Sequence, residues 1–516
     1  MTLSVKSIFI IGFSTPILKD VALRLQESGM SIVYWQGYRD YFKTIATDRK
    51  SFPDTIFHYA NDAIRNIPPR EVDTSIFEPP DKTCIEKMYP YSGQAMFLIE
   101  RADYTGFPLS RKRHLYYEYI SFWKGMLKKF KPDAILLSDV PHDGTTYVLY
   151  ALARLQNIPI LITDQIGVES RTLLINDYKS SSLALRDDYE SNKDKNYQVE
   201  DLSLDLREYY LKHTTPAADA TPEYQKRASQ RKAPFRTPTF SAVIRHILHL
   251  SFLRVTYSYL RMLLTKNEEQ SLDEPMAGWR YKFIINRWIK LNRALQHELK
   301  GQQVMPDFNK KFIYIPLNIQ PERTTCPQAG VWDDQLLLIE TAARSLPDGW
   351  VIYVKENPNQ LAPVNIFSHI YRYQGYYEAI AKLKNVYLVP EQTSTYDLIN
   401  NAQAVATGTG TAGWEALLRS KPALVFSSVW YMYCDGVLRV SDVVSCQKAI
   451  SAIVNGFKPD KQKVLNYLVA LDRNSVRARH FRTLCYRESD YKKNDYISHE
   501  DNVKNLSLAL SNAILC

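Results

Sequence analysis

The 516-residue sequence predicts an α/β fold with two α/β domains that are joined by a long helical linker. The chain is longer than one hydrophobic core usually organises, which indicates more than one domain. Short apolar runs alternate with amphipathic segments in two separate sets, and the composition between the sets turns polar and then basic. We therefore divide the chain into a first α/β domain, a polar excursion with a basic helical linker, a second α/β domain and a tail expected to be helical, at residues 1–178, 179–305, 306–480 and 481–516.

The first set has four apolar runs with the length and β-branched content of buried strands. Polar turn residues follow each run, and two amphipathic segments lie between them. The strands are predicted at residues 7–13, 31–36, 133–139 and 158–164, and the helices at 15–29 and 145–157. From Lys179 to about Ala220 the sequence is rich in Ser, Asp, Lys and Asn, which indicates a surface excursion or a partly disordered stretch.

The second set repeats this alternation without any internal repeat of sequence. Strands are predicted at 311–317, 350–356, 386–390, 404–407 and 422–426, and helices at 332–346 and 394–401. In α/β sheets, ligands bind outside the carboxyl ends of the strands. We therefore expect the two domains to face each other across a ligand cleft at these ends.

The composition excludes several classes of protein. With 45% hydrophobic residues, 23% charged residues and a mean hydropathy of -0.31, the chain has a globular composition, and it lacks the roughly 18 apolar residues of a spanning helix. The apolar run near the N-terminus fits a first buried strand better than a signal peptide. Six cysteines without a CxxC pair favour reduced thiols over disulfides or zinc. We expect a cytoplasmic protein with no metal and no resident cofactor.

The positive charge is confined to one segment. The net charge is +10, and residues 226–300 alone hold 15 Lys and Arg against 5 Asp and Glu, so the rest of the chain is neutral. Within this segment, apolar residues 241–266 are interrupted by arginines, as in a helix with a wide apolar face. The segment is either an interdomain helix with solvated arginines or a basic amphipathic helix on an anionic membrane surface. Nucleic acid is not an expected partner, because no recognition motif accompanies the charge.

Residues 406–418, "ATGTGTAGWEALL", contain glycines at the spacing of the dinucleotide-binding fingerprint G-x-G-x-x-G. That fingerprint belongs to the first strand and helix of a domain, whereas this turn lies about a hundred residues into the second one, and no G-K-[ST] of a P-loop is present. A strand, a turn of small residues and a helix N-terminus still form a favourable place for an anion. We predict a phosphate cradle, with a purely structural turn as the alternative, made of Thr407, Gly408, Thr409, Gly410, Thr411 and Gly413.

Several stretches in order, "YIPLNIQPERTT", "WVIYVKENPNQ" and "LVPEQTSTYDLINNAQAVATGTGTAGWEALL", resemble the capsular-polysaccharide biosynthesis proteins that include bacterial Kdo transferases. The resemblance covers roughly residues 310–440, with a weaker echo in residues 132–164. It implies a GT-B-like fold of two Rossmann-like domains facing a cleft. It also implies a metal-independent transferase that takes an acidic sugar, such as Kdo or another nonulosonic acid, from a CMP-linked donor.

The resemblance also assigns residues to the donor site. Related CMP-sugar enzymes place a His-Pro pair against the cytidine phosphate, and the matching pair here is Asn357 and Pro358. Asparagine donates a hydrogen bond but carries no positive charge, so we expect Lys355 to supply that charge. Ser394 and Thr395 are expected either to cap a helix or to contact the nucleotide. Glu415 could accept from a ribose hydroxyl or simply favour the helix N-terminus, and Gln320 completes the predicted donor site.

The acceptor hydroxyl requires a base, and the sequence leaves two mechanisms open. The retaining Kdo transferases that the chain resembles carry an aspartate after the strand that here ends near Gln320, where this sequence has Glu322. Either Glu322 takes the place of this nucleophile, or the reaction inverts the anomeric centre and Asp139 or His142, just past a predicted strand, deprotonates the acceptor. Asp164 and Glu169 are weaker candidates of the same kind.

We therefore predict a glycosyltransferase of capsule or lipopolysaccharide synthesis that transfers an acidic sugar from a CMP-linked donor to a glycan or lipid-linked oligosaccharide acceptor. The basic segment would hold the enzyme at the inner face of a membrane. Two alternatives remain at this stage. One is a transferase for a UDP- or GDP-linked sugar. The other is a non-catalytic scaffold of a polysaccharide assembly complex, which the missing histidine before Pro358 favours.

Overall fold

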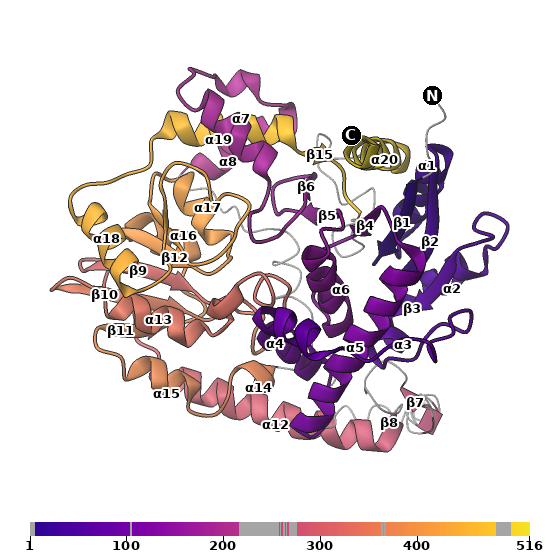
Figure 1. Cartoon of the computed structure of the whole chain (residues 1–516). Helices are drawn as coiled ribbons and strands as arrows, with labels where there is room; N and C mark the ends of the chain where they lie inside the picture. Colours follow the sequence, from indigo (N-terminus) through magenta and orange to yellow (C-terminus); the bar gives the residue numbers. More distant parts are fainter. Residues whose placement is uncertain are drawn as a thin grey trace.

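The computed structural model describes residues 6–103, 106–215, 276–362, 365, 368–480 and 497–515, together with residues 257, 260, 261, 264, 266 and 267. Two sheets, each flanked by helices, form two units side by side (Figure 1). This confirms the predicted α/β class with two Rossmann-like domains. The nine predicted strands are all present within one to three residues of the expected bounds, and the structure adds further strands at the sheet edges.

The first sheet has seven strands in the order β15-β6-β5-β4-β1-β2-β3. Strands β1 to β5 are parallel, and β6 near one edge pairs antiparallel with both β5 and the edge strand β15. Their bounds are Lys6–Ile11 (β1), Met30–Gly37 (β2), Ile56–Tyr59 (β3), Ala134–Leu137 (β4), Ile160–Gln165 (β5), Arg171–Ile175 (β6) and Val476–Arg477 (β15). The strand β3 carries only four residues in a polar surrounding, which explains why the sequence pattern did not reveal it.

Helices α1 and α6 of the first unit start at side-chain caps. The Thr15 hydroxyl accepts from the amide of Leu18 and Pro16 follows it at the start of α1, and Asp143 accepts from the amide of Thr146 at the start of α6. Helix α6 packs against α4 and α5. The helices are α1 (Pro16–Glu27), α2 (Arg39–Thr47), α3 (Ala60–Ile64), α4 (Lys82–Ala102), α5 (Leu109–Phe130) and α6 (Gly144–Leu155).

The second sheet has six parallel strands in the order β11-β10-β9-β12-β13-β14. Their bounds are Lys311–Pro316 (β9), Trp350–Lys355 (β10), Val386–Val389 (β11), Ala404–Thr407 (β12), Ala423–Val425 (β13) and Val437–Arg439 (β14). Flanking helices are α13 (Gln335–Ala343), α14 (Ser368–Tyr371), α15 (Tyr376–Ala381), α16 (Thr395–Asn401), α17 (Ala412–Leu417) and α18 (Val443–Val454). In both sheets the strand order thus reverses at the same place, beside the first strand of each unit.

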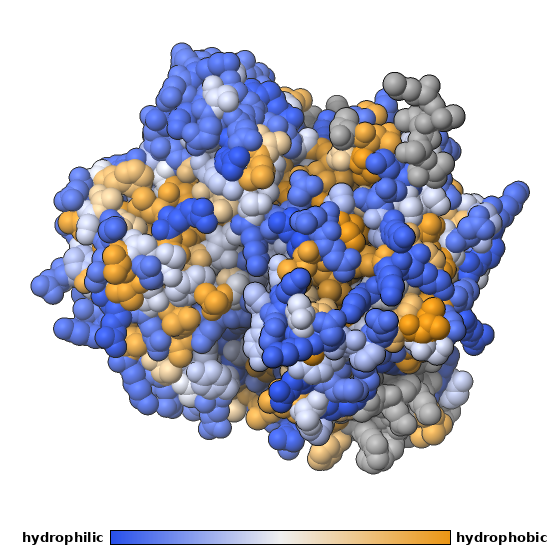
Figure 2. Space-filling view, in the orientation of Figure 1, coloured by the Kyte–Doolittle hydropathy of each residue, from blue (hydrophilic) through white to orange (hydrophobic). Residues whose placement is uncertain are grey.

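The polar stretch from Lys179 to about Ala220 is not an excursion or a disordered stretch as far as the structure describes it, to residue 215. It forms α7 (Leu183–Asn192) and α8 (Leu204–Thr214), and α7 packs against α19 (Lys461–Asn474). Sparse apolar side chains such as Leu185 and Leu206 are fully buried, while hydrophilic residues cover the outside of this group, at the top of Figures 1 and 2. The composition was polar because these short helices bury only a narrow face.

A buried ion cluster ties this helical group to the first sheet. The Arg171 guanidinium, on β6, donates to the carboxylates of Asp205 on α8 and Asp472 on α19 at 2.7 and 2.8 Å. Just after α19 the chain joins the first sheet as β15, and α20 (His499–Leu515) then packs against α1. The C-terminal segment therefore returns to the first unit before residue 480, and a helix occupies residues 499–515 as expected of the tail.

The predicted amphipathic helix at 241–266 lies almost entirely outside the described residues. The later part of the basic segment forms α12 (Gly278–Gln302), which runs along α14 and α15 at the bottom of Figure 1. Its apolar side chains Ile285, Trp288, Leu295 and Leu299 are buried. Of its basic side chains, the structure describes Arg287, Lys290, Arg293 and Lys300, which are exposed. This part of the segment is therefore a packed helix of the second unit. In the part of the chain that the structure describes, we find no helix with the length and hydrophobicity needed to span a bilayer.

Candidate active site

The two sheets place their switch points opposite each other. In doubly wound sheets, ligands bind where the strand order reverses, because the loops leave the sheet in opposite directions and open a crevice there. In the first unit this point lies between β1 and β4, and in the second between β9 and β12. The loops that follow these strands carry Asp139, His142, Glu322 and the turn that starts at Thr407. The topology thus gathers the main predicted residues at facing edges.

Arg323 joins the two edges. It lies in the loop after β9 of the second unit and reaches the first unit, where its Nε lies 3.0 Å from Asp139 Oδ1. Its Nη1 lies 2.8 Å from Asp164 Oδ1, and its Nη2 donates to the backbone oxygen of Gln165 at 3.1 Å. A single guanidinium therefore binds the carboxylate of Asp139 in the loop after β4, and the carboxylate of Asp164 and the carbonyl of Gln165 on β5.

The charges of this cluster depend on one another. Burial raises the pKa of Asp139, and the nearby Arg323 guanidinium opposes that rise. Burial also disfavours the charge of Arg323, but Asp139 and Asp164 together raise its pKa above the ordinary value. Arg323 thus stays protonated and holds two acidic side chains that would otherwise repel each other. Asp139 is fixed rather than free, since its Oδ1 also accepts from the amide of Val140 at 2.8 Å.

His142 is the more available base. Its Nδ1 lies 2.8 Å from the backbone oxygen of Val140, and because a carbonyl can only accept, Nδ1 carries the proton. This leaves Nε2 unprotonated in the neutral ring, with its lone pair ready to accept a proton. The side chain is exposed and lies near Asp139. His142 has the tautomer that a general base requires.

The turn after β12 is held by its own side chains. The hydroxyl of Thr407 accepts from the amide of Gly410 at 2.9 Å, and the Thr409 hydroxyl donates to the Thr324 carbonyl and accepts from Asn318 Nδ2, both at 2.7 Å. These two hydroxyls were expected to face a phosphate, but their hydrogen bonds fold the turn onto the loop after β9. What the turn offers an anion is its backbone and the exposed Thr411 hydroxyl, which makes only a 3.5 Å contact with Glu415.

Two glycines of the turn are required by close packing. A Cβ on Gly410 would lie 2.7 Å from the Thr407 hydroxyl, and one on Gly413 would lie 2.4 Å from the Tyr431 hydroxyl. That hydroxyl donates to the carbonyl of Gly410 and closes the turn from the far side. Gly408 has only ordinary contacts around it. Gly413 therefore serves the folding of the turn, where the sequence pattern predicted space for a phosphate.

Lys355 ends β10 and points to the start of α16. Its Nζ donates to the Thr393 carbonyl at 2.6 Å and to the Thr395 hydroxyl at 2.8 Å, while Ser394 caps α16 by accepting from the Asp397 amide. Burial lowers the pKa of Lys355 to about 8, against the opposing charge of Glu391. An ammonium has three N–H donors, so one remains for a ligand. Lys355 and Thr395 thus lie together, and Ser394 caps the helix.

Gln320 lies in a buried network behind this edge, whereas Asn357 is half-buried and Pro358 is exposed. Gln320 donates to the Asp333 carbonyl at 3.0 Å and accepts from Gln335 and Arg372. Arg372 in turn pairs with Glu356 at 2.7 Å, both fully buried, and Asn357 Oδ1 accepts from the Asn359 amide. All polar atoms of the Gln320 side chain thus have protein partners. The structure brings this residue near the site as a support for the loop after β9.

Glu415 lies one turn into α17 at the interface of the two units. Burial raises its pKa, which the nearby Arg419 opposes. Its neighbour Trp414 donates from Nε1 to the hydroxyl of Tyr209 on α8 at 3.1 Å. Glu415 is half-buried and retains acceptor capacity toward a ribose hydroxyl. Glu169 has contacts in the loop between β5 and β6 and adopts a positive φ of 39°.

Glu322 is exposed at the start of the loop after β9. Its Oε2 accepts from the hydroxyl of Thr324 at 2.7 Å, and its backbone oxygen accepts from the amides of Thr325 and Cys326. One carboxylate oxygen is left for a substrate. Within the described ranges, no group of three or more His, Cys, Asp or Glu side chains gathers in a way that could hold a metal ion.

Three residues of this site escaped the sequence analysis as contributors. Arg323 stands in the quoted "QPERTT" stretch, but a loop arginine gives no sign of its partner across a domain boundary. Asn318 and Tyr431 shape the turn after β12 from positions 91 residues before Thr409 and 21 residues after Gly410. Only the polar character of the segment after β9 could have pointed to Arg323 and Asn318.

Comparison with known proteins gives one match by family and several by fold. Residues 275–440 match the family described as capsule polysaccharide biosynthesis protein. Among solved structures, the chain is similar to the KpsC β-Kdo 2,7-transferase of Thermosulfurimonas dismutans, with 13% identity, 75% of this chain and 88% of that chain covered, and a TM-score of 0.29. It is also similar to the UDP-GlcNAc 2-epimerase of Neisseria meningitidis, with 12% identity, 99% and 100% covered, and a TM-score of 0.21. No curated protein gives a significant match.

Proposed function

We propose, from the match of residues 275–440 to the capsule polysaccharide biosynthesis family, that this chain is a glycosyltransferase for an acidic sugar. The donor in this proposal is CMP-linked, as in the enzymes that the sequence resembles, and the acceptor is a glycan or lipid-linked oligosaccharide. The reaction needs no metal and no resident cofactor. Its support is the pair of facing switch points, which supplies an anion-binding edge and a proton-accepting edge in one place.

The donor side of the proposal rests on the second unit. A departing CMP carries negative charge on its phosphate, and donors aimed at that charge lower the barrier. Lys355 retains one N–H, the turn Thr407–Gly413 presents its backbone at the start of α17, and Glu415 lies within the following turn of helix. These groups would hold the phosphate and the ribose, while Gln320, Asn318 and Tyr431 fix the loops that carry them.

The acceptor side rests on the first unit. His142 Nε2 accepts the proton of the attacking hydroxyl, and the carboxylate of Asp139 stabilises the imidazolium that results. This arrangement gives direct displacement with inversion at the anomeric carbon. The alternative is a retaining reaction with Glu322 as nucleophile, which its exposed and only partly engaged carboxylate permits.

The observation that carries the proposal is the contact of Arg323 with Asp139 and Asp164, because it holds the two edges at one site. Calorimetric titration with CMP, UDP, GDP and NAD tests the donor class. We expect CMP to bind most tightly of the four. Preference for UDP or GDP would move the donor to a neutral sugar nucleotide, and preference for NAD or silence toward all four would remove the assignment.

A scaffold without catalysis is the candidate from another class. The absence of a histidine before Pro358 favours it, since the charge usually found there is missing. Turnover of CMP-Kdo and CMP-sialic acid by the purified chain, with acidic oligosaccharides as acceptors, decides between them. Release of CMP that depends on the acceptor supports the transferase, whereas nucleotide binding without any release supports the scaffold.

Attachment to the inner face of a membrane is the remaining part of the proposal. It rests on the net charge of residues 226–300, most of which lie outside the described residues. Sedimentation with neutral and anionic vesicles tests it, with Arg231, Lys232, Arg236, Arg245 and Arg254 changed to Gln as the comparison. Binding that needs anionic lipid, weakens with salt and is lost in the variant supports attachment. Equal binding by both chains returns the segment to an interdomain helix.

A further inference from the structure

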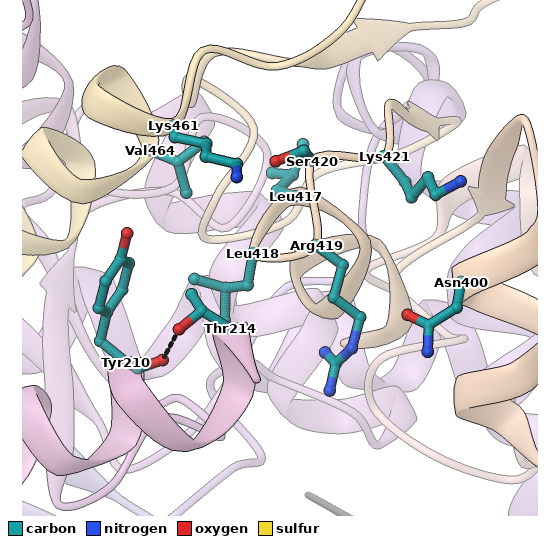
Figure 3. A pocket seen from close by; sticks show the side chains of 10 residues that line it. All are labelled: Tyr210, Thr214, Asn400, Leu417, Leu418, Arg419, Ser420, Lys421, Lys461 and Val464. Atoms are coloured by element: carbon teal, nitrogen blue, oxygen red, sulfur yellow. Dashed lines mark hydrogen bonds between the residues drawn. The ribbon is translucent and has the colours of Figure 1, made fainter. Parts of the chain in front are cut away.

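A cavity opens away from the facing edges, between α8, the end of α17 and the start of α19 (Figure 3). Its volume is about 460 Å³, enough for a small molecule. Leu417, Leu418 and Val464 give it an apolar wall, and the ring of Tyr210 stands beside Val464. The cavity joins elements of both units, so a ligand here would touch α8 and α17 together.

The charge of the lining is one-sided. Of its ten residues, Arg419, Lys421 and Lys461 are basic and none is acidic. Burial lowers the pKa of Lys421, and the nearby positive charge of Lys458 lowers it further. The carboxylate of Glu415 lies near Arg419. The Nζ of Lys421 donates to the Ala402 carbonyl at 2.9 Å. The remaining positive charge faces the opening without a counter-charge among the lining residues.

Several donors at this cavity are not used by the described part of the protein. Arg419 Nη1 donates to the backbone oxygen of Glu415, and its guanidinium stacks on the ring of Tyr396 at 4.5 Å. Its Nε and Nη2, and the Oγ of Ser420, are buried and have no hydrogen-bond partner there. Leaving buried donors unsatisfied costs about 1–3 kcal/mol each, and a small rotation toward an oxyanion would recover that loss. Lys461 extends toward Ser420 across the opening.

We propose that this cavity is an anion site that binds a carboxylate or phosphate carried on a small carbon skeleton, such as an acidic sugar or a sugar phosphate. Lys461, Arg419 and Ser420 hold the oxyanion, and the apolar wall with Tyr210 packs against the skeleton. The site is distinct from the predicted donor site, because α17 carries the turn Thr407–Gly413 at one end and this cavity at the other. The six residues of α17 separate the two ends by about 9 Å.

The test measures affinity for three probes by calorimetry: inorganic phosphate, glucuronic acid and the neutral sugar glucose. The central variant is Lys461→Glu, which reverses one exposed charge of the cavity without disturbing a hydrogen bond that the structure shows. Lys448→Gln on α18, also exposed, is the matched control for a lost surface charge. Lys355→Ala marks any anion that binds at the predicted donor site instead.

We expect phosphate, glucuronic acid or both to bind, glucose not to bind, and Lys461→Glu to weaken the bound anion at least tenfold. Lys448→Gln and Lys355→Ala should leave that binding unchanged. Loss for phosphate alone identifies a phosphate group as the ligand, and loss for glucuronic acid alone identifies a carboxylate. Binding that is weakened by Lys355→Ala and not by Lys461→Glu, equal binding by wild type and Lys461→Glu, or no binding of either anion overturns the proposal.

Discussion

The central strands of the two sheets follow the same order, but their carboxyl edges carry different side chains. After β4 and within β5, the first unit presents the acidic side chains of Asp139 and Asp164 together with the imidazole of His142. After β9, β10 and β12, the second unit presents Lys355, threonine hydroxyls and a turn with glycines. The shared topology determines where a ligand binds, and the residues after each strand determine what is done to it. In the proposed reaction, one edge accepts protons and the other stabilises negative charge.

The largest expected effect comes from removing the base of the first edge. In His142→Gln, the acceptor hydroxyl loses the group that takes its proton, so kcat should fall by about 10²–10⁴. Nucleotide affinity should stay the same, because His142 belongs to the other edge. Initial rates of CMP release and calorimetry with CMP measure the two quantities separately.

The matching change on the second unit is Glu322→Gln. If the reaction inverts, this variant should keep most of its activity, since Glu322 then has no covalent role. An inactive Glu322→Gln together with an active His142→Gln would instead assign Glu322 as the nucleophile of a retaining reaction. Asp139→Asn should fall between the two, because it weakens the stabilisation of the imidazolium but leaves the base in place.

The next effect concerns the contact that joins the edges. Arg323→Met leaves Asp139 and Asp164 close together without a cation, and breaking a buried ion cluster from one side costs about 3 kcal/mol. Unfolding in urea should show this loss. Arg344→Met, an exposed arginine after α13, is the control and should change stability by less than about 0.5 kcal/mol.

A triple variant separates charge from shape in this cluster. Adding Asp139→Asn and Asp164→Asn to Arg323→Met removes the repulsion, so much of the lost stability should return. If Arg323→Met unfolds at the same urea concentration as the wild type, Arg323 does not hold the two units together.

A smaller effect distinguishes folding from ligand binding in the turn of the second unit. Gly413→Ala brings a Cβ to 2.4 Å from the Tyr431 hydroxyl, and such overpacking costs about 1–3 kcal/mol of stability. In the Tyr431→Phe background the oxygen is gone, so the same change should cost less. Gly301→Ala near the end of α12, with open space around it, should be neutral or stabilising. A Gly413→Ala chain of unchanged stability but weaker nucleotide binding would restore the original prediction of a phosphate at this glycine.

The sequence predicted the frame of both edges because strands leave a local signature. Runs such as residues 133–139 and 350–356 are apolar and β-branched, and the polar residues that end them had to lie at a carboxyl edge. The structure places His142 after β4, Lys355 at the end of β10 and Thr395 at the start of α16. The polar stretch before Thr215 was misjudged, because α7 and α8 bury few side chains and owe their place to α19, which lies more than 240 residues further along the chain.

The details of the site depended on contacts that no local pattern contains. Gln320 was assigned to the donor, whereas Asp333, Gln335 and Arg372 use its amide inside the second unit. Gly413 fits a glycine fingerprint, yet the hydroxyl of Tyr431 is what excludes a side chain at this position. In each case the deciding partner comes from a different segment, so sequence spacing finds the position and the three-dimensional structure decides its task.

The smallest expected effect is the pH dependence of the second edge. Burial lowers the pKa of Lys355 to about 8, so its ammonium is charged below that pH and neutral above it. A nucleotide phosphate held by this charge should therefore bind more weakly as the pH rises from 7 to 9. Because the charged fraction of Lys355 falls from about 0.9 at pH 7 to about 0.1 at pH 9, the loss should reach at most about tenfold in Kd, or about 1.4 kcal/mol. The phosphate itself adds no step in this range, since its second pKa lies near 6.

Lys355→Ala should bind weakly at both pH values, and Lys355→Arg should lose the pH dependence, because a guanidinium stays protonated. Calorimetry with CMP at pH 7 and pH 9 measures all three chains, and a wild type that binds CMP equally at both values would place the charge that meets the phosphate elsewhere.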